Sequence, residues 1–407
     1  MSKSNNVFTL GCRLNFWESN QINSLLSPAQ KKGIVVFNTC SVTNEAVKSS
    51  QKSIRAFSKK NPEIKIVVTG CGAESDKELF EEMIEVSEVV RNSEKLKSKT
   101  WQKIPPSNYQ KLDINTFFNK ENPSNSSVRK FVKIQNGCNH SCTFCIIPSC
   151  RGKSISRKFE EINNDINFNL KNNIREIILT GVDITSWGED FNNQLYLSDL
   201  IEKILSSHPK LERLRLSSID VAEIDEKLIK LIGSESRLMP HLHFSLQSFD
   251  DMILKRMKRR HTTQHVRELF KAIKSVNPEL TFGADFITGF PTETNDMFNN
   301  TLNSIEELEI SHLHVFPYSE KKGTPAAKMP QVPINVRRER AKALRKQGHQ
   351  VFEKKLSSQI NRKHRVLIED ETGTGRTENN FRVKTTNISK GEIIDITPKK
   401  TFNNILF

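Results

Sequence analysis

The sequence lacks any long apolar run, and it lacks an even number of cysteines. No stretch approaches the roughly 18 apolar residues that would span a bilayer, and the opening MSKSNNVFTLGC has no apolar core of the kind that a secretory signal needs. We therefore expect a cytoplasmic protein without membrane contact. The seven cysteines are an odd number, which excludes a fully paired disulfide framework, and in the cytoplasm such thiols serve as metal ligands or stay free.

Acidic residues are also in deficit. The 407 residues include 47 Asp and Glu against 62 Lys and Arg, which gives a formal net charge of +15. This excess favours a polyanionic partner, although a lysine-rich composition alone would produce it too. With 36% apolar and 27% charged residues the composition is that of a globular protein, and the length allows two or three domains.

One short stretch, Gly137–Gly152, carries the strongest chemical signal. It reads GCNHSCTFCIIPSCRG and places Cys138, Cys142 and Cys145, hereafter the loop cysteines, at C-x3-C-x2-C spacing. Three thiolates this close can hold three irons of a [4Fe–4S] cluster and leave the fourth iron without a protein ligand. A structural zinc site is the main alternative, because His140 lies in the same loop and offers a fourth ligand.

The first segment contains three more cysteines in one recurring position. Strands are predicted at Val7–Leu10, Ile34–Asn38, Ile64–Thr69 and Glu88–Arg91, with a helix at Val42–Lys59. Strands that alternate with helices form a mostly parallel sheet. Cys12, Cys40 and Cys71, hereafter the N-terminal cysteines, each follow the end of a strand, where open α/β sheets bind ligands. They predict a second three-cysteine site, the alternative being three separate buried thiols.

The middle of the chain repeats the strand–helix alternation after a polar stretch, Asn119–Ser127, that is typical of a linker. Strands are predicted at Lys130–Ile134, Glu176–Thr180, Arg213–Ser217, His241–Leu246, Thr281–Ile287 and His312–Phe316. Six parallel strands would form an open, partial barrel whose chemistry gathers at the C-terminal ends of the strands. The cysteine loop and four further motifs occupy such ends: TGVDITSWG (Thr180–Gly188), RLSSID (Arg215–Asp220), HFSLQS (His243–Ser248) and ITGFPTET (Ile287–Thr294).

The last segment begins with a strongly basic predicted helix, Ile334–Leu356. Strands are predicted after it at Lys363–Asp370, Arg376–Lys384 and Glu392–Thr397, separated by turns that contain glycine. They indicate a small β-barrel that carries several Lys and Arg residues.

Together these motifs resemble those of one family, the methylthiotransferases, which are radical S-adenosylmethionine (SAM) enzymes that insert sulfur and then methylate it. The resemblance covers nearly the whole chain. Its elements are LGCRLN, NTCSVT and TGCGAE, then KIQNGCNHSCTFCIIPSCRG, LTGVDITSWGED, RLSSID, LQS…LKRMKRRHT and GADFITGFPTET, and finally HVFPYSEKKGTPAAKMPQVP and GRTENNFRV.

The resemblance implies an α/β protein with three domains. An α/β open-sheet domain would occupy residues 1–118, followed by a linker at 119–128. The radical SAM core, a TIM-like partial (β/α)6 barrel, would occupy 129–352. A small OB-like β-barrel, the RNA-binding TRAM domain, would occupy 353–407.

The resemblance also implies cofactors and partners. Two [4Fe–4S] clusters are expected, one on the loop cysteines with SAM at its open iron, and one on the N-terminal cysteines. In that chemistry a SAM-derived radical takes the hydrogen from C2 of the target adenine, sulfur from the second cluster joins C2, and a second SAM supplies the methyl group. The implied partners are a tRNA anticodon stem-loop, a flavodoxin- or ferredoxin-like electron donor and a sulfur donor.

Further residues are expected around SAM by the same resemblance, and each also has a purely structural alternative. Phe144 would pack beside the SAM adenine or serve as a core aromatic, and Gly289 with Glu293 would shape the adenine pocket or form a turn and helix start. The set is Phe144, Thr180, Gly181, Asp183, Ser217, Ser218, Gln247, Gly289 and Glu293.

Other residues receive separate expectations. Arg151 is expected to face the pocket, and Cys150 to be a free thiol near the site, because cluster ligation is satisfied without it. His241 and His243 alternate on a strand, and we expect structural roles for them. Phe381 in the terminal domain is expected to stack on unpaired RNA bases.

Three branches of the family differ in substrate. Two modify the adenosine beside the tRNA anticodon, which carries either a threonylcarbamoyl or an isopentenyl group, and the third modifies an aspartate of a ribosomal protein. LGCRLN, CNHSCTFCIIP and HVFPYSEKKGTP most resemble the threonylcarbamoyladenosine branch. Two alternatives stay open: a substrate of another branch, and a zinc-containing RNA-binding protein without catalysis.

Overall fold

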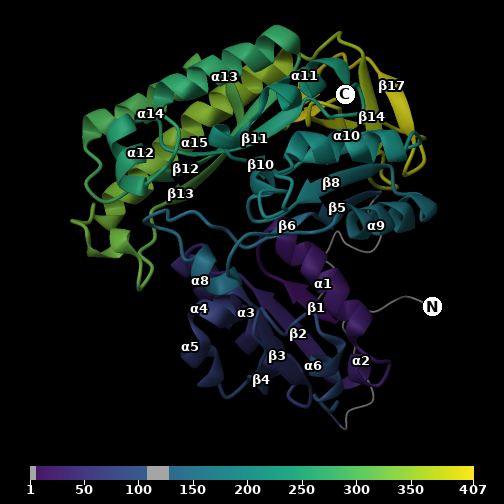
Figure 1. Cartoon of the computed structure of the whole chain (residues 1–407), viewed down its shortest axis with the longest axis vertical. Helices are drawn as coiled ribbons and strands as arrows, with labels where there is room; N and C mark the ends of the chain where they lie inside the picture. The colour runs from purple at the N-terminus through teal and green to yellow at the C-terminus, as the bar shows by residue number, and fades with distance from the viewer. Residues whose placement is uncertain (1–5, 108–127) are drawn as a thin grey trace.

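The computed structural model describes residues 6–107 and 128–407. Three parts follow one another along the chain, as the colours of Figure 1 show: an N-terminal part in purple and blue, a barrel in teal and green, and a C-terminal sheet in yellow. The predicted linker at Asn119–Ser127 lies outside the described residues.

Parallel strands in the order β1-β2-β3-β4 form the sheet of the N-terminal part. The strands are β1 Val7–Thr9, β2 Ile34–Thr39, β3 Lys65–Gly70 and β4 Glu88–Val89. The helices are α1 Arg13–Leu25, α2 Gln30–Gly33, α3 Asn44–Lys60, α4 Cys71–Ser75, α5 Lys77–Glu81 and α6 Ser98–Gln102. The predicted strands and the predicted helix are confirmed, with ends that differ by one or two residues.

Burial on both faces explains why the strands of this sheet are apolar throughout. Along β2, Val35 and Phe37 pack into the core beneath α3, whereas Ile34 and Val36 pack into the core on the opposite face. A strand covered on both sides reads as a continuous apolar run, as IVVF does, rather than as an alternation. The polar ends of these strands are therefore the places where function can be built.

Parallel strands in sequence order form the partial barrel. Strands β5, β8 and β9 make one sheet, and β10 to β13 make the next. The chain passes from β9 to β10 through Ser217 alone, so the two sheets are one curved surface. The strands are β5 Arg129–Lys133, β8 Glu176–Thr180, β9 Arg213–Leu216, β10 Ser218–Ile219, β11 His241–Gln247, β12 Thr281–Thr288 and β13 Ile310–Pro317. Each strand predicted for the barrel is confirmed.

Helices cover the outside of the barrel, as Figure 1 shows. They are α9 Phe159–Lys171, α10 Leu197–Ser207, α11 Glu226–Ser234, α13 Thr263–Val276 and α14 Asn295–Glu307. The shorter α12 Asp251–Met257 packs in a separate small core, and α8 Ile147–Arg151 lies beside α4 of the N-terminal part. A short hairpin, β6 Gln135–Asn136 and β7 Ile155–Ser156, brackets the cysteine loop.

Side chains along the barrel strands alternate between two environments. Leu242, Phe244, Phe282 and Phe286 pack with the helices in the main core. Because successive side chains of a strand point to opposite faces, the residues between them point into the barrel. These inward residues are mainly polar: Glu176, Arg213, Arg215, His241, His243, Thr281, Asp285, His312 and His314. The barrel thus encloses a polar lumen.

The C-terminal part consists of a long helix and a small sheet. Helix α15 spans Ile334–Ser357, which confirms the predicted helix, and it packs Leu344 into the barrel core and Leu356 into the C-terminal core. The strands are β14 His364–Ile368, β15 Thr374–Arg376, β16 Arg382–Lys384, β17 Ile393–Ile396, β18 Thr401–Phe402 and β19 Ile405–Leu406, in the order β17-β14-β15-β16-β19-β18.

Two predictions about the C-terminal part are wrong. The predicted strand Arg376–Lys384 is a hairpin, because Asn380 has a φ of +81° and the Thr377 hydroxyl accepts a hydrogen bond from the Phe381 N–H at 2.8 Å. Phe381 does not present its ring to RNA. The ring is fully buried, with its centroid 5.7 Å from that of Phe352.

The turn of this hairpin closes the N-terminal end of the barrel. Arg213 donates to the carbonyl oxygen of Thr377 at 2.9 Å, and the hydroxyl of Thr281 donates to that of Asn379 at 2.8 Å. Arg213 and Thr281 each begin a strand, so the C-terminal part lies at the end of the barrel opposite the cysteine loop.

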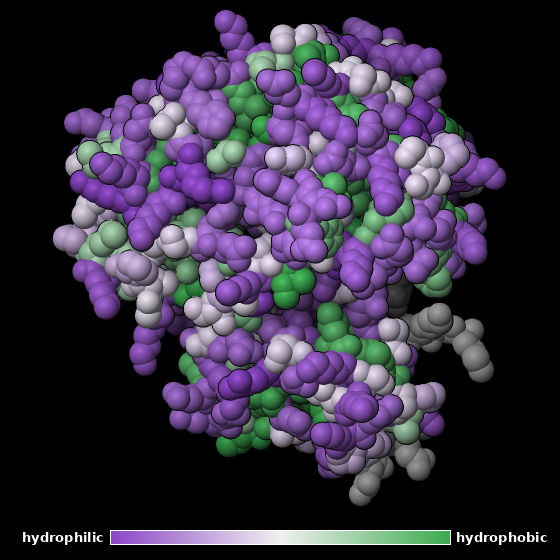
Figure 2. All heavy atoms as spheres, viewed as in Figure 1, coloured by the Kyte–Doolittle hydropathy of each residue, from purple (hydrophilic) through white to green (hydrophobic). Residues whose placement is uncertain are grey.

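The surface is largely hydrophilic on the face seen in Figure 2, where apolar atoms form small scattered groups. Within the described ranges, no helix combines the length and the apolar character needed to cross a membrane.

Candidate active site

The N-terminal cysteines follow adjacent strands. Cys12 comes after β1, Cys40 directly after β2 and Cys71 directly after β3. Gly70 lets the ends of β2 and β3 approach each other closely. Its φ is +99°, and a Cβ on it would lie 2.3 Å from the carbonyl oxygen of Thr39. The three thiols therefore gather at one edge of the sheet.

The N-terminal thiols differ in exposure: Cys71 is buried, Cys40 is half-buried and Cys12 is exposed. Desolvation by the surrounding protein raises the pKa of Cys40 to about 11 and also raises the pKa of Cys12, and the neighbouring Cys71 thiol adds to both effects. The N–H of Val42 points to the Cys40 sulfur at 3.5 Å. Thiolates in this setting need a compensating positive charge, which iron supplies when it binds.

The loop cysteines share this environment. Burial raises the pKa of Cys138 to about 12 and that of Cys145 to about 11. The backbone N–H two residues further on points to each of these sulfurs at 3.4 Å, and the Arg259 guanidinium lies 3.7 Å from the Cys142 sulfur. Hydrogen bonds to sulfur of this kind tune iron–sulfur clusters.

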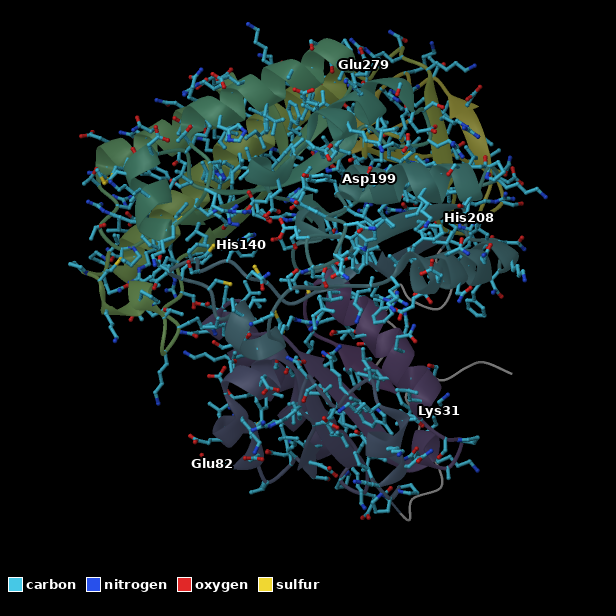
Figure 3. All side chains as sticks on the ribbon, in the orientation of Figure 1. Lys31, Glu82, His140, Asp199, His208 and Glu279 are labelled. Atoms are coloured by element: carbon cyan, nitrogen blue, oxygen red, sulfur yellow. The ribbon has the colours of Figure 1, made fainter. Side chains whose placement is uncertain are left out.

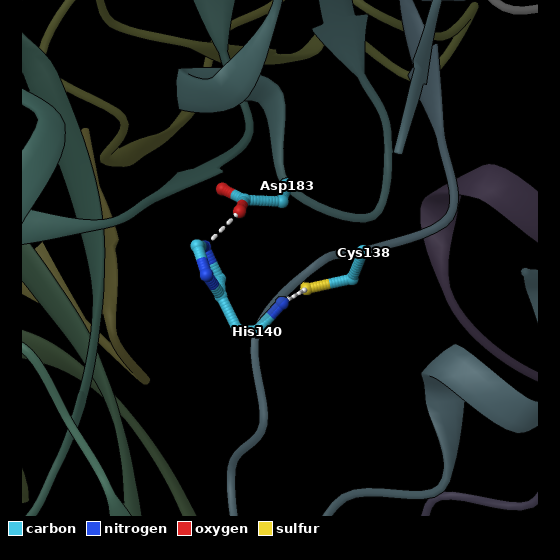
Figure 4. A group of neighbouring side chains, drawn as sticks. All are labelled: Cys138, His140 and Asp183. Carbon is cyan, nitrogen blue, oxygen red and sulfur yellow. Dashed lines mark hydrogen bonds and ion pairs between the residues drawn. The ribbon is translucent and has the colours of Figure 1, made fainter. Parts of the chain in front are cut away.

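His140, the candidate fourth zinc ligand, is engaged elsewhere. Its Nε2 lies 2.5 Å from Asp183 Oδ2 and 3.4 Å from Glu223 Oε1, as Figure 4 shows for Asp183. The hydrogen bonds that His140 donates to Asp183 and Glu223 raise its pKa to about 10, although burial and the charge of Arg260 oppose them. A protonated imidazole has no lone pair for a metal.

The spacing of the sulfurs also argues against zinc. Thiolates on one zinc ion sit about 2.3 Å from it and hence about 4 Å from one another. In the parts of the chain that the structure describes, two groups of three His, Cys, Asp or Glu ligand atoms come within 4.8 Å of one another: Cys138 with His140 and Asp183, and His243 with Asp285 and His314. Neither group contains two of the six cysteines, so the loop cysteines do not converge on one zinc position. Each set therefore suits a larger group, such as a four-iron cluster.

Arg151 joins the barrel to the N-terminal part. Its guanidinium donates to the Cys71 sulfur at 3.0 Å, to the Glu18 carboxylate at 2.7 Å and to the Asn15 side-chain oxygen at 2.9 Å. Glu18 also binds Lys95 at 2.6 Å, and the three charged side chains are at most 3% exposed. Two cations thus face one carboxylate and one thiol, an arrangement that stabilises a negatively charged group at the N-terminal cysteines.

Both cysteine sets meet at this junction. Arg151 lies six positions after Cys145 and contacts Cys71, and Cys150 donates its thiol to the Cys71 carbonyl oxygen at 3.7 Å. Cys150 is a free, buried thiol. Figure 3 shows His140 at the same junction, with sulfur atoms beside it between the barrel and the N-terminal part.

Gln135 organises the rim next to the loop cysteines, and sequence reasoning missed it. Its Oε1 accepts the backbone N–H groups of Val182 and Asp183 at 3.0 and 2.9 Å, and its Nε2 donates to the Gly137 carbonyl at 2.7 Å. It therefore ties the start of the cysteine loop to the segment after Thr180. The only signal was its position in the motif KIQNG.

The other predicted SAM residues lie along the same rim. Thr180 ends β8, Gly181 and Asp183 follow it, and Ser217 separates β9 from β10, where Ser218 begins. Gln247 ends β11 with a φ of +68°, at a shift in the strand register. Their contact with SAM stays a prediction.

Gly289, Glu293 and Phe144 have protein partners. Glu293 accepts the Gly289 N–H at 2.7 Å and an ion pair from Arg340 of α15 at 2.7 Å. Phe144 packs with its ring centroid 6.4 Å from that of Phe290. The first pair thus anchors α15 to the rim, and a role in the adenine pocket stays a prediction.

Comparisons with known proteins match both halves of this site. Residues 132–305 match the model of the Radical SAM superfamily, and residues 5–91 match a family described as uncharacterized protein family UPF0004. Among solved structures, the radical SAM methyltransferase TsrM from Kitasatospora setae aligns with a TM-score of 0.53 at 12% identity, over 76% of this chain and 68% of that one. The barrel is thus that of a radical SAM enzyme.

Curated relatives narrow the assignment. A threonylcarbamoyladenosine tRNA methylthiotransferase of Rickettsia prowazekii is 44% identical over 93% of this chain and 90% of its own length. A Bacillus subtilis protein of the same name is 32% identical over 94% and 88%. A tRNA-2-methylthio-N(6)-dimethylallyladenosine synthase of a Marinomonas species is 29% identical over 93% and 90%. The chain belongs to the tRNA methylthiotransferase family of radical SAM enzymes, whose cofactors are SAM and two [4Fe–4S] clusters.

Proposed function

We propose that this enzyme inserts sulfur and a methyl group at C2 of N6-threonylcarbamoyladenosine beside the tRNA anticodon. The relative of that name from Rickettsia prowazekii, at 44% identity, supports this substrate over the isopentenyl-type substrate of the 29% identical relative. The observation that carries the chemistry is the contact between Arg151 and Cys71, because it brings both cysteine sets to one junction.

The loop cysteines hold the cluster that binds SAM, and the N-terminal cysteines hold the second cluster. When bound, these groups supply the electron, the radical chemistry and the sulfur. The residues of the chain position them. Gln135 fixes the cysteine loop against the segment of Gly181 and Asp183, and Arg151 with Glu18 holds the N-terminal part against the barrel.

SAM lies along the rim formed by the C-terminal ends of the barrel strands. The residues that line it in this proposal are Phe144, Thr180, Gly181, Asp183, Ser217, Ser218, Gln247, Gly289 and Glu293. Thr180 and Asp183 are largely buried, so the protein holds both side chains in place at this rim.

The tRNA anticodon stem-loop binds across the junction, and the net charge of +15 favours its phosphates. The C-terminal part, from about residue 353, adds RNA contacts through exposed cations such as Arg382 rather than through Phe381. A flavodoxin- or ferredoxin-like donor supplies electrons, a separate donor supplies sulfur, and the reaction takes place in the cytoplasm with the tRNA.

The test is an anaerobic assay with reconstituted protein, SAM and reductant. Three substrates are compared: tRNA with the threonylcarbamoyl group, tRNA with the isopentenyl group, and the ribosomal protein whose aspartate the third branch modifies. Mass spectrometry should detect a methylthio product on the first only. A product on either of the others would reassign the branch, and SAM cleavage without any methylthio product would contradict sulfur insertion.

A further inference from the structure

Three inward side chains from neighbouring strands form one cluster in the lumen. Asp285 Oδ1 lies 3.0 Å from Nε2 of His243 and 3.0 Å from Nδ1 of His314. Gly283 leaves the room that His243 needs, since a Cβ there would lie 2.4 Å from its Nδ1. The His243 side chain is 3% exposed and that of His314 is 54% exposed, so the cluster opens to solvent on one side.

Arg13 reaches this lumen from the N-terminal part. It directly follows Cys12 and begins α1, which lies against the inner side of β5, where the centroids of Phe16 and Phe131 are 6.5 Å apart. Arg13 and Phe16 lie three positions apart and hence on the same face of α1, so the part-buried Arg13 also faces the lumen. Its positive charge acts on Asp285 and on His243.

Arg13 differs from the other arginines of the lumen. Arg129, Arg213 and Arg215 each pair with Glu176 at 2.8 to 2.9 Å. For the partly buried Arg13, the described parts of the chain provide neither an ion pair nor a side-chain hydrogen bond. A part-buried guanidinium without protein partners keeps N–H donors that it can offer to a ligand.

The chemistry of these lumen side chains indicates a ligand. A guanidinium recognises a carboxylate through two parallel N–H bonds. Asp285 beside it presents a carboxylate, which accepts bonds from a hydroxyl or N–H group. Arg13 and Asp285 together thus suit a group that carries an anion and a donor a few ångströms apart, as a hydroxy amino acid does.

We propose that Arg13 and the cluster of Asp285, His243 and His314 recognise the amino-acid part of the modified adenosine. Arg13 binds its carboxylate, and Asp285 binds its hydroxyl or its N–H. This inference rests on the proposed substrate. Binding of the amino-acid part would also orient the base, because N6, which carries that part, and C2 lie on the same edge of adenine. Arg13 directly follows Cys12, a ligand of the proposed second cluster, so C2 would face that cluster.

Binding without turnover tests the proposal. The reconstituted full-length protein is titrated, without reductant, with labelled anticodon stem-loops that carry threonylcarbamoyladenosine, isopentenyladenosine or plain adenosine. Arg13→Gln should raise the Kd of the threonylcarbamoyl stem-loop roughly 10- to 100-fold and leave the Kd of the plain stem-loop unchanged. Arg13→Lys should keep part of the preference, since the charge remains.

Two further variants separate the possible causes. Asp285 lies far from every cysteine in the sequence, and Asp285→Asn should also reduce the preference for the threonylcarbamoyl stem-loop. The iron content of each variant shows whether the iron–sulfur clusters remain. Arg55→Gln removes a charge from the exposed face of the same N-terminal part, where its side chain is 59% exposed, and should affect all stem-loops equally.

The outcomes distinguish the two levels of the argument. If the parent protein does not prefer the threonylcarbamoyl stem-loop, the proposed function fails. If the parent prefers it and Arg13→Gln keeps the full preference, or weakens every stem-loop alike, the subsite is wrong while the function stands. The subsite would also be overturned if a divalent metal bound stoichiometrically to Asp285, His243 and His314 and was lost in Asp285→Asn.

Discussion

Removal of Arg151 should separate the two parts of the enzyme more than any surface substitution. Glu18 is 2% exposed and has two cationic partners, Arg151 at 2.7 Å and Lys95 at 2.6 Å. Arg151→Met retains most of the apolar volume but removes one partner of the carboxylate and the N–H that points to the Cys71 sulfur. The change thus leaves the buried carboxylate with Lys95 as its cationic partner and without the two hydrogen bonds that Arg151 donates to it.

Hydrogen bonds to a buried charged group contribute about 1.5–3 kcal/mol, because the group cannot exchange them for water. We therefore expect Arg151→Met to lower the free energy of unfolding by about that amount. Arg267→Met is the matched control: its ion pair with Glu307 at 2.5 Å is more than 40% exposed on both sides, and such pairs contribute about 0–1 kcal/mol.

Urea unfolding followed by tryptophan fluorescence measures this difference. Trp17 and Trp101 report on the N-terminal part and Trp187 on the barrel. The midpoint of unfolding should move to lower urea for Arg151→Met and stay in place for Arg267→Met. If both variants lose the same small amount, the junction does not depend on this network and the reasoning is refuted.

Three further predictions concern other parts of the structure. Burial raises the pKa of Glu18, but Lys95 and Arg151 lower it further, to about 2. The stabilisation is therefore present above the ordinary pKa of 4.5 and is lost as the pH falls toward 2, so Glu18→Gln should flatten the acid limb of stability, and an unchanged limb would contradict this. Gln135→Leu removes an acceptor shared by two backbone N–H groups and should raise the Kd of SAM at least about tenfold at constant iron content, measured by equilibrium dialysis beside Gln102→Leu; equal affinities would exclude the role. Phe381→Ala should destabilise the protein by about 3–5 kcal/mol without a specific loss of RNA affinity, and the reverse pattern would restore base stacking.

The elements of the fold could be predicted because their signals are local. The apolar runs before Cys40 and Cys71 are strands that need burial on both faces, and only a parallel sheet between helices provides it. The position of each cysteine just past a strand followed from the same pattern. The hairpin inside residues 376–384 was missed because both sides of its turn have the sequence pattern of a strand. The turn depends on the bond from the Phe381 N–H to the Thr377 hydroxyl, which that pattern does not reveal.

The partners in the site could not be predicted, because they are distant in the sequence. Arg151 meets Glu18 across 133 positions, and Asp285 meets the histidines of two neighbouring strands. Only the three-dimensional register of the strands and the docking of α1 on the barrel create these contacts. The burial of Phe381 has the same origin, since His312 and Phe352 reach it from other elements.

The most direct test of the central claim is the iron and sulfide content of the anaerobically reconstituted protein. The parent chain should hold about eight irons, the number in two four-iron clusters. A variant with Cys12→Ala, Cys40→Ala and Cys71→Ala should hold about four, and so should one with Cys138→Ala, Cys142→Ala and Cys145→Ala. About four irons in the parent and in the first variant alike would reduce the N-terminal cysteines to core residues, and zinc without iron would contradict the account as a whole.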